Sequence, residues 1–212
     1  MLDILYQDDH ILALNKPAGI PVLPDGWQPD APYLRKMLET ELGRIFVVHR
    51  LDKVTSGIMV FARTAEAHRV LNQQFERHEV EKIYHAIVEG FPSWDEKVCR
   101  MPLRVNVGKK HRTAADNKRG KPSETRFKVM ERGQAWTLLE ARPMTGRTHQ
   151  IRAHLYALGY PLMGDVLYGA SVSDLISRPA LHALSLAFFH PASGEFMNFI
   201  AKYPGDFAFI KA

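Results

Sequence analysis

The stretch VVHRLDKVTSGIMVFAR, residues 47–63, passes from a short apolar run into the polar tetrapeptide His49–Asp52, and then through small residues into a second apolar run. The second run, Gly57–Arg63, is typical of a buried strand. Asp52 therefore lies in a loop just before this predicted strand, which would hold the loop in place. Catalytic groups tend to lie in such loops, and the simpler alternative is a turn aspartate that caps its own backbone.

Further elements are predicted on both sides of this stretch. Apolar runs indicate strands at 10–15, 83–89, 125–132, 135–142, 181–189 and 196–203, the last four forming two hairpins. Helices are predicted over 33–42, from a cap at Thr64 to about residue 78, and over 149–158 after a cap at Thr148. Because strands outnumber helices and several are joined by hairpins, we predict an α+β fold with a mixed, largely antiparallel sheet and flanking helices.

The composition predicts one domain over residues 1–212. Hydrophobic residues make up 46% and charged residues 24% of the chain, close to average globular usage. A lone cysteine, Cys99, permits no internal disulfide and fits a reducing compartment. The start of the chain carries acids where a signal peptide needs basic residues, and the apolar stretch 183–189 is too short to span a bilayer. We therefore expect a cytoplasmic protein without a membrane, and we favour a monomer.

The positive charge is concentrated in one segment. Residues 100–128 hold ten lysines or arginines and two acids, a net charge of +8, whereas the other 183 residues sum to −3. Such a segment suits a polyanion partner, and the plainer interpretation is a solvated loop. Its middle, residues 108–122, has little apolar content and is predicted to be a long exposed loop.

Several common chemistries have no motif in this chain. The sequence contains no phosphate-binding P-loop, no G-x-G-x-x-G, no H-E-x-x-H and no serine in a G-x-S-x-G turn. Its ten histidines lack the spacing of metal ligands, and one cysteine makes no zinc knuckle. We therefore predict no cofactor and no metal, so the chain works with side chains alone or only binds.

Two further segments carry candidate groups. PMTGRTHQIRAHLYALG, residues 143–159, places Arg147 and Arg152 around the start of a predicted helix. A buried arginine near a carboxylate keeps it ionised, and the alternative is a pair of surface arginines that meet phosphate or solvent. KIYHAIVEG, residues 82–90, is a predicted strand with Tyr84 near its entry, where a packing role is the alternative to a catalytic one.

Together these segments resemble a known family. The sequences HRLDKVTSG (49–57), K-x-Y (82–84) and GRTHQIRAH (146–154) resemble the signature of the RluA-type RNA pseudouridine synthases. NKPAG (15–19), GDVLYG (164–169), LHA (181–183) and HPASG (190–194) match in the family's order, so the resemblance covers residues 1 to about 204. It implies the pseudouridine synthase catalytic fold with its cleft. Some relatives carry an S4-type RNA-binding domain before this fold, and we expect none here.

The resemblance also implies a reaction and roles. These isomerases break the N1–C1′ bond of a uridine in RNA and join C5 to C1′, which needs no cofactor. Asp52 corresponds to the family's catalytic aspartate, which either attacks C1′ or assists departure of the base. Arg152 corresponds to the arginine that holds it ionised and aimed. Tyr84 corresponds to the active-site tyrosine; an ordinary phenol, with a pKa of ~10, is a poor base at pH 7, so we rank stacking on the base above proton transfer.

The resemblance gives the basic residues a partner, rRNA or tRNA. The target base must be flipped out of the RNA, and Arg50 resembles the side chain that fills the vacated space. The predicted RNA-binding residues are Arg50, Arg147, Lys109, Lys110, Arg112, Lys118 and Arg119. Two alternatives stay open: a non-catalytic RNA-binding protein on the same scaffold, and a hydrolase or nuclease that uses Asp52 with a metal, which lacks a second acid close by in sequence.

Overall fold

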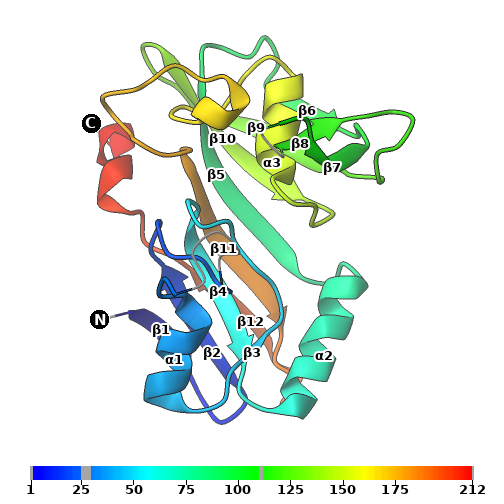
Figure 1. Ribbon diagram of the computed structural model, residues 1–212, viewed down its shortest axis with the longest axis vertical. Coiled ribbons are helices and arrows are strands. Elements are labelled where there is room, and N and C mark those ends of the chain that lie inside the picture. Colours follow the sequence, from blue (N-terminus) through cyan, green and yellow to red (C-terminus); the bar gives the residue numbers. More distant parts are fainter. Residues whose placement is uncertain (1, 25–29, 110–111, 212) are drawn as a thin grey trace. The chain divides into compact units, whose positions relative to one another are not determined.

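The computed structural model describes residues 2–24, 30–109 and 112–211 (Figure 1). The chain divides into two compact units, one formed by 1–81 with 183–203 and the other by 82–182 with 204–212. The strands are β1 Asp3–Gln7, β2 Ile11–Lys16, β3 Phe46–Val47, β4 Ser56–Ala62, β5 Glu81–Glu89, β6 Glu96–Cys99, β7 Leu103–Val107, β8 Arg112–Ala115, β9 Thr125–Arg132, β10 Trp136–Pro143, β11 Leu181–Phe189 and β12 Phe196–Ile200. The helices are α1 Leu34–Leu42, α2 Ala65–Glu76, α3 Gln150–Ala157 and the 3-10 turns η1 Val166–Tyr168 and η2 Gly205–Lys211.

The first unit is built around strand β4. Its strand order is β1-β2-β4-β11, with β12 paired to β11 and β3 paired to β4. All seven residues of β4 are buried, as are four successive residues of β2, so both faces of these strands are covered and their sequences are continuous apolar runs. Helix α2 packs on β4 and begins at Thr64, whose side chain accepts a hydrogen bond from the amide of Ala67 at 3.1 Å.

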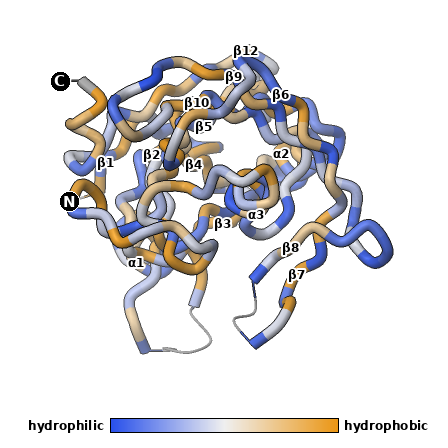
Figure 2. The backbone as a smooth tube through the Cα atoms, turned by 90° about the horizontal axis from the view of Figure 1, so that it is seen from above, coloured by the Kyte–Doolittle hydropathy of each residue, from blue (hydrophilic) through white to orange (hydrophobic). Residues whose placement is uncertain are grey.

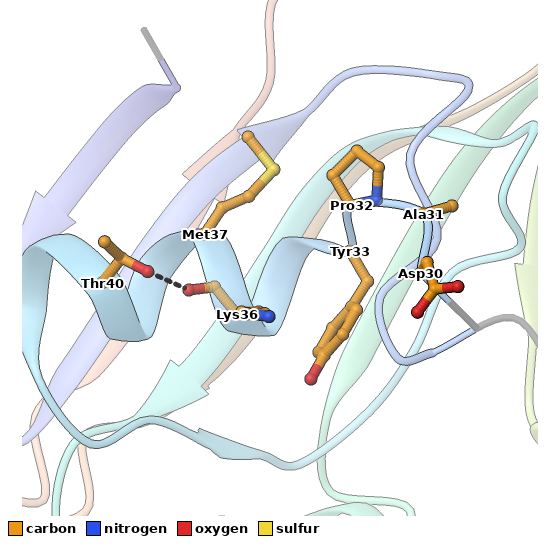
Figure 3. A pocket seen from close by; sticks show the side chains of 7 residues that line it. All are labelled: Asp30, Ala31, Pro32, Tyr33, Lys36, Met37 and Thr40. Atoms are coloured by element: carbon orange, nitrogen blue, oxygen red, sulfur yellow. Dashed lines mark hydrogen bonds between the residues drawn. The ribbon is translucent and has the colours of Figure 1, made fainter. Parts of the chain in front are cut away.

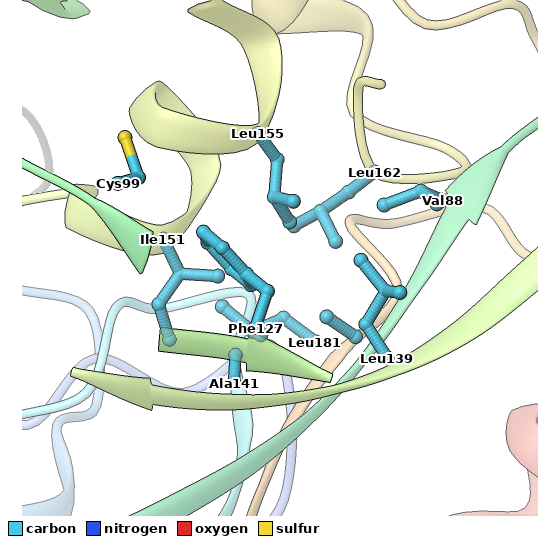
Figure 4. Packing of buried hydrophobic residues seen from close by; sticks show 10 residues of the cluster. Val88, Cys99, Phe127, Leu139, Ala141, Ile151, Leu155, Leu162 and Leu181 are labelled. Carbon is cyan, nitrogen blue, oxygen red and sulfur yellow. The ribbon is translucent and has the colours of Figure 1, made fainter. Parts of the chain in front are cut away.

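The second unit is a four-stranded antiparallel sheet with one helix packed on it. The order is β5-β10-β9-β6, and the pairs β5–β10, β10–β9 and β9–β6 are all antiparallel. Its core contains Phe127 and Leu139 from the strands, and Ile151 and Leu155 from α3 (Figure 4). The helix is thereby fixed to the sheet by apolar side chains, which leaves its polar side chains at its N-terminal half for other contacts.

The basic segment forms structure that the sequence analysis missed. Strands β7 and β8 make a separate two-stranded antiparallel sheet, in which Arg104 pairs with Ala114. The predicted exposed loop 108–122 is therefore wrong in part, because Arg112–Ala115 is a strand and Thr113 is buried. The strand forms because β8 packs on α3, a contact between distant parts of the chain that no apolar pattern indicated. Hydrophilic colouring dominates the connections around this hairpin (Figure 2).

The α+β class, the largely antiparallel pairing and both predicted hairpins are confirmed. Helix α3 starts at residue 150, one residue after the predicted start. The predicted cap at Thr148 is wrong, because the N-cap is His149. His149 has a φ of 52°, in the left-handed region, and makes no side-chain cap hydrogen bond. The short strands β1, β3 and β6 were also missed. That residues 1–212 form a single domain stays a prediction.

Candidate active site

Asp52 lies in a tight turn of the first unit. The backbone carbonyl of Asp52 accepts a hydrogen bond from the Thr55 amide at 3.0 Å. Leu51 is buried before it, whereas Asp52 is half-buried and Arg50 is exposed. The turn therefore anchors its apolar residue in the core and leaves Asp52 partly exposed.

Hydrogen bonds from residues 16–20 also hold this turn. The carbonyl oxygen of Lys53 accepts hydrogen bonds from the Gly19 amide at 2.7 Å and from Lys16 Nζ at 3.3 Å. Lys16 is fully buried, and its ammonium also donates to the carbonyls of Pro17 and Ile20, each at 2.8 Å. A buried ammonium needs several acceptors, and here it draws them from both segments. The NKPAG sequence therefore fixes the residue next to Asp52.

His49 joins the same turn to β4 and α2. The Val60 amide donates to His49 Nε2 at 3.0 Å, so this nitrogen carries no proton, and the imidazole stacks on Phe75 of α2 at 4.8 Å between ring centroids. At the start of β4, Gly57 has a φ of +119°, and a Cβ built there would lie 2.2 Å from the carbonyl oxygen of Ala183. Only glycine allows this approach of two strands.

Arg152 lies on α3 in the second unit and forms a buried ion pair. Its Nε and Nη2 donate to the two carboxylate oxygens of Asp165 at 2.7 and 2.9 Å. The side chains are 5% and 1% exposed. This planar, two-bond geometry fixes the guanidinium in both position and orientation. Since a guanidinium has five N–H donors, Arg152 can serve a further acceptor at the same time.

The start of α3 is fixed by the side chain of Gln150 rather than by Thr148. Its Oε1 accepts from Thr145 Oγ1 at 2.7 Å and from the Arg147 amide at 3.0 Å. Its Nε2 donates to the Glu124 carbonyl at 2.9 Å. One buried amide thus replaces the expected cap and ties the GRTHQ loop to strand β9.

Tyr84 lies on β5, opposite Ala141 of β10, and packs against the cluster that contains Ile151 of α3. It is half-buried, so packing accounts for part of its surface. Two residues earlier on the same face of the strand, burial lowers the pKa of Lys82. Tyr84 and Arg152 are therefore carried by packed elements of one unit, and Asp52 by the other.

The predicted RNA-binding residues fall into three groups. Arg50, Lys109, Lys118 and Arg119 are exposed. Arg147 is also exposed, and its guanidinium donates to the Pro122 carbonyl at 3.3 Å. Arg112 is half-buried, with its guanidinium 4.9 Å above the ring of Tyr156. Lys110 lies outside the described residues.

The turn at 116–120 presents its cations in a fixed form. Asp116 Oδ1 accepts hydrogen bonds from the amides of Lys118 and Arg119, each at 2.9 Å. These bonds lower the pKa of Asp116, with further help from Arg104, which forms an ion pair with it at 3.1 Å. The turn therefore stays tied at neutral pH while both basic side chains face solvent.

Sequence reasoning missed the residues that hold these groups in place. Asp165, Lys16, His49 and Gln150 all lie within motifs that carried the family resemblance, but no role was assigned to any of them. The signal for Asp165 was its place in GDVLYG, a polar residue in a turn between apolar stretches. Its partner, 13 residues away on a helix, follows only from the folded structure.

Neither a metal cluster nor a membrane span is present in the described parts of the chain. Among those residues, no three histidine, cysteine or acidic side chains are grouped so that they could hold an ion. Likewise, no helix within them is long and apolar enough to cross a membrane. A pocket beside α1 is lined by residues from Asp30 to Thr40, Tyr33 and Lys36 among them, and none of the predicted site residues contributes to it (Figure 3).

Comparison with known proteins identifies the class. The family described as RNA pseudouridylate synthase matches residues 10–157. The chain is 36% identical over 222 residues to a protein named ribosomal large subunit pseudouridine synthase D from Zymomonas mobilis, covering 97% of this chain and 70% of that one. The solved structure of human RNA pseudouridylate synthase domain containing 1 superimposes with a TM-score of 0.81 at 29% identity, covering 96% of this chain and 84% of that one.

A relative of similar length narrows the class. The dual-specificity RNA pseudouridine synthase RluA of Escherichia coli K12 is 38% identical over 208 residues, which is 97% of this chain and 94% of that protein. The chain belongs to the RluA-type RNA pseudouridine synthase family. It is an isomerase that acts on RNA, which confirms the predicted family and activity and gives no support to a non-catalytic binding protein.

Proposed function

We propose that this enzyme converts a uridine of large-subunit rRNA, tRNA or both into pseudouridine, with Asp52 as the catalytic carboxylate. Relatives named for the large ribosomal subunit and for dual specificity support this range of substrates. The observation that carries the assignment of Asp52 is the clamped turn: backbone and buried side chains fix residues 49–57, yet Asp52 itself is only half-buried. A group that acts on C1′ needs this combination of fixed position and access.

The other roles follow from the chemistry of each side chain. Arg152 keeps Asp52 ionised and aimed, because a guanidinium held by Asp165 offers a positive charge of fixed orientation. Tyr84 stacks on the flipped base, and the exposed Arg50 fills the space that the base leaves. Asp52 either attacks C1′ or assists departure of the base. The N1–C1′ bond breaks and the C5–C1′ bond forms, so no atom is gained or lost and no cofactor is required.

The basic hairpin, by which we mean β7 and β8 together with the turn at 116–120, grips the phosphates around the target. Of its predicted contacts, Lys109, Lys118 and Arg119 are exposed, and the turn that carries the last two is held by Asp116. Lys110, Arg112 and Arg147 complete this set. We place the enzyme in the cytoplasm with its RNA substrates, and we propose that it acts as a monomer.

Replacement of Asp52 by asparagine tests the proposal. Asp52→Asn keeps the shape of the side chain and removes the charge, so we expect unchanged folding and no detectable product. The measurement is mapping of pseudouridine in unmodified tRNA and large-subunit rRNA transcripts after derivatisation with a carbodiimide, because uridine and pseudouridine have the same mass. Lys36→Ala, at an exposed lysine of α1, is the control and should retain full activity. Product formation by Asp52→Asn would remove this aspartate from the central role.

The grip on phosphates predicts a strong dependence of RNA affinity on salt. Each neutralised phosphate contributes about 0.7–0.9 to the slope of log K against log salt concentration. Removing two cations in Lys118→Ala/Arg119→Ala should therefore lower the slope by about 1.5, as measured by fluorescence anisotropy between about 50 and 200 mM salt. Lys36→Ala should leave it unchanged. An equal slope in the double variant would assign the binding charge to other residues.

A further inference from the structure

The hydroxyl of Tyr168 joins the basic hairpin to the helix that carries Arg152. It accepts a hydrogen bond from the Thr113 amide at 2.9 Å and donates to the Thr113 carbonyl at 3.0 Å. His149 Nδ1, at the start of α3, lies 3.2 Å away. Because the single proton of the hydroxyl goes to the carbonyl, His149 is the donor in the third contact. One buried oxygen therefore satisfies both backbone groups of a residue in β8.

The ring of the same tyrosine faces the guanidinium of Arg152. The carbon Cζ of Arg152 lies 5.1 Å from the ring centroid, a cation–π distance. Tyr168 and Asp165 stand in one tight turn, in which the Tyr168 amide donates to the Asp165 carbonyl at 2.9 Å. This single turn thus holds Arg152 through a carboxylate and an aromatic face, and holds β8 through a hydroxyl.

Packing alone does not account for the hydroxyl. Tyr168 is fully buried beside Leu103 and Ala153, where a phenylalanine would fill nearly the same volume. Burying a hydroxyl costs free energy unless every bond to it is made, and here all its bonds are made to the hairpin and to the N-cap of α3. A two-stranded sheet such as β7–β8 is marginally stable by itself, so its order depends on contacts of this kind.

We propose that Tyr168 is a positioning residue that couples RNA contact at the basic hairpin to the placement of Arg152. The inference rests on the proposed function of Arg152 and of the hairpin cations. RNA bound by Lys118 and Arg119 stabilises the hairpin, so that Thr113 keeps its hold on the Tyr168 hydroxyl, and the ring and Asp165 keep the guanidinium fixed for its work on the catalytic carboxylate. Chemistry thereby proceeds fastest on RNA that the hairpin has gripped.

Tyr168→Phe tests the coupling, because it keeps the ring and deletes the three polar contacts. At saturating RNA we expect the single-turnover rate to fall about tenfold, while the dissociation constant changes less than threefold. Tyr156→Phe is the matched control: its ring lies 5.9 Å from that of Tyr168, and no hydrogen bond of its hydroxyl is found within the described residues. This control should react at the wild-type rate. A Tyr168→Phe rate within twofold of wild type would overturn the proposal.

A double-mutant cycle separates coupling from a general structural defect. In the wild-type background, Lys118→Ala/Arg119→Ala should lower the saturated rate about fivefold; in the Tyr168→Phe background it should cause no further loss. Equal losses in both backgrounds, or no loss in the wild-type background, would overturn the coupling. Thermal unfolding of each variant shows whether a rate change follows from lost stability.

Hydrogen exchange provides a readout that does not depend on catalysis. RNA should protect the amides of residues 165–168 in the wild type and not in Tyr168→Phe. Equal protection in both proteins contradicts the coupling even if no RNA is modified. Absence of pseudouridine from the wild-type reaction would instead contradict the proposed function, so the two failures are distinct.

Discussion

The turn that carries Asp52 and the helix that carries Arg152 are fixed by different kinds of contact. Around Asp52 the contacts are mainly to backbone: carbonyls collect donors from Thr55, Gly19 and Lys16, and Gly57 lets two strands approach. On the helix of Arg152 the contacts join buried side chains: Arg152 meets the Asp165 carboxylate and the ring of Tyr168, and the Gln150 amide meets the Thr125 hydroxyl. A backbone turn depends on space and on φ, whereas a buried polar network depends on complete pairing of its charges and hydrogen bonds.

Breaking the ion pair should have the largest effect on the helix side. Asp165→Asn leaves the Arg152 charge buried without its anion, which costs about 3–5 kcal/mol in the free energy of unfolding. Activity should fall as well, because the guanidinium loses its fixed orientation. Urea denaturation and the single-turnover rate measure the two effects. Glu66→Gln breaks an exposed ion pair with Arg69 and is the control, with no change expected. A neutral result at Asp165 would mean that the pair is dispensable.

Crowding the backbone should have the next largest effect, on the side of Asp52. Gly57→Ala forces a positive φ on alanine and places Cβ 2.2 Å from a backbone oxygen. Together these cost about 3 kcal/mol in the free energy of unfolding. Gly194→Ala separates the two terms, since Gly194 has a φ of +73° and nothing within 4 Å of the added Cβ. It should lose only the conformational part, about 1–2 kcal/mol. Equal losses would show that β11 moves aside.

The two regions also differ in how well they could be predicted from the sequence, because one depends on backbone contacts and the other on pairs of side chains. The HRLD turn and strand β4 could be predicted, because a glycine after small residues and a continuous apolar run are local signals. The hairpin β7–β8 could not, because the backbone of Thr113 finds its hydrogen-bond partner in Tyr168, 55 residues away. For the same reason Asp165 was not predicted as the partner of Arg152. Local patterns report the backbone, and pairings between distant polar side chains appear only once the chain is folded.

Acid should act on the helix side through His154. This buried residue bridges Thr125 Oγ1 and the Met101 carbonyl, each at 2.9 Å, and burial lowers its pKa. Burial also lowers the pKa of His85 on β5. Below pH ~6.5 the unfolded chain binds protons at these histidines and the folded chain does not. Stability is therefore complete above that pH and falls as the pH decreases, by about 1.4 kcal/mol per pH unit for each histidine until its folded pKa is reached.

Urea denaturation between about pH 5.5 and 7.5 measures this dependence. In His154→Gln the slope of the unfolding free energy against pH should decrease by the contribution of one histidine. Glutamine keeps a donor and an acceptor but does not titrate, so the variant loses less stability on acidification, whatever its stability at pH 7.5. His78→Asn is the control: His78 is exposed at φ 60°, a conformation that asparagine tolerates, and the replacement should leave the slope as in the wild type. If the dependence of stability on pH is unchanged in His154→Gln, the acid sensitivity of this region lies at His85. The contacts of His154 with Thr125 and Met101 would then accommodate a charged imidazole.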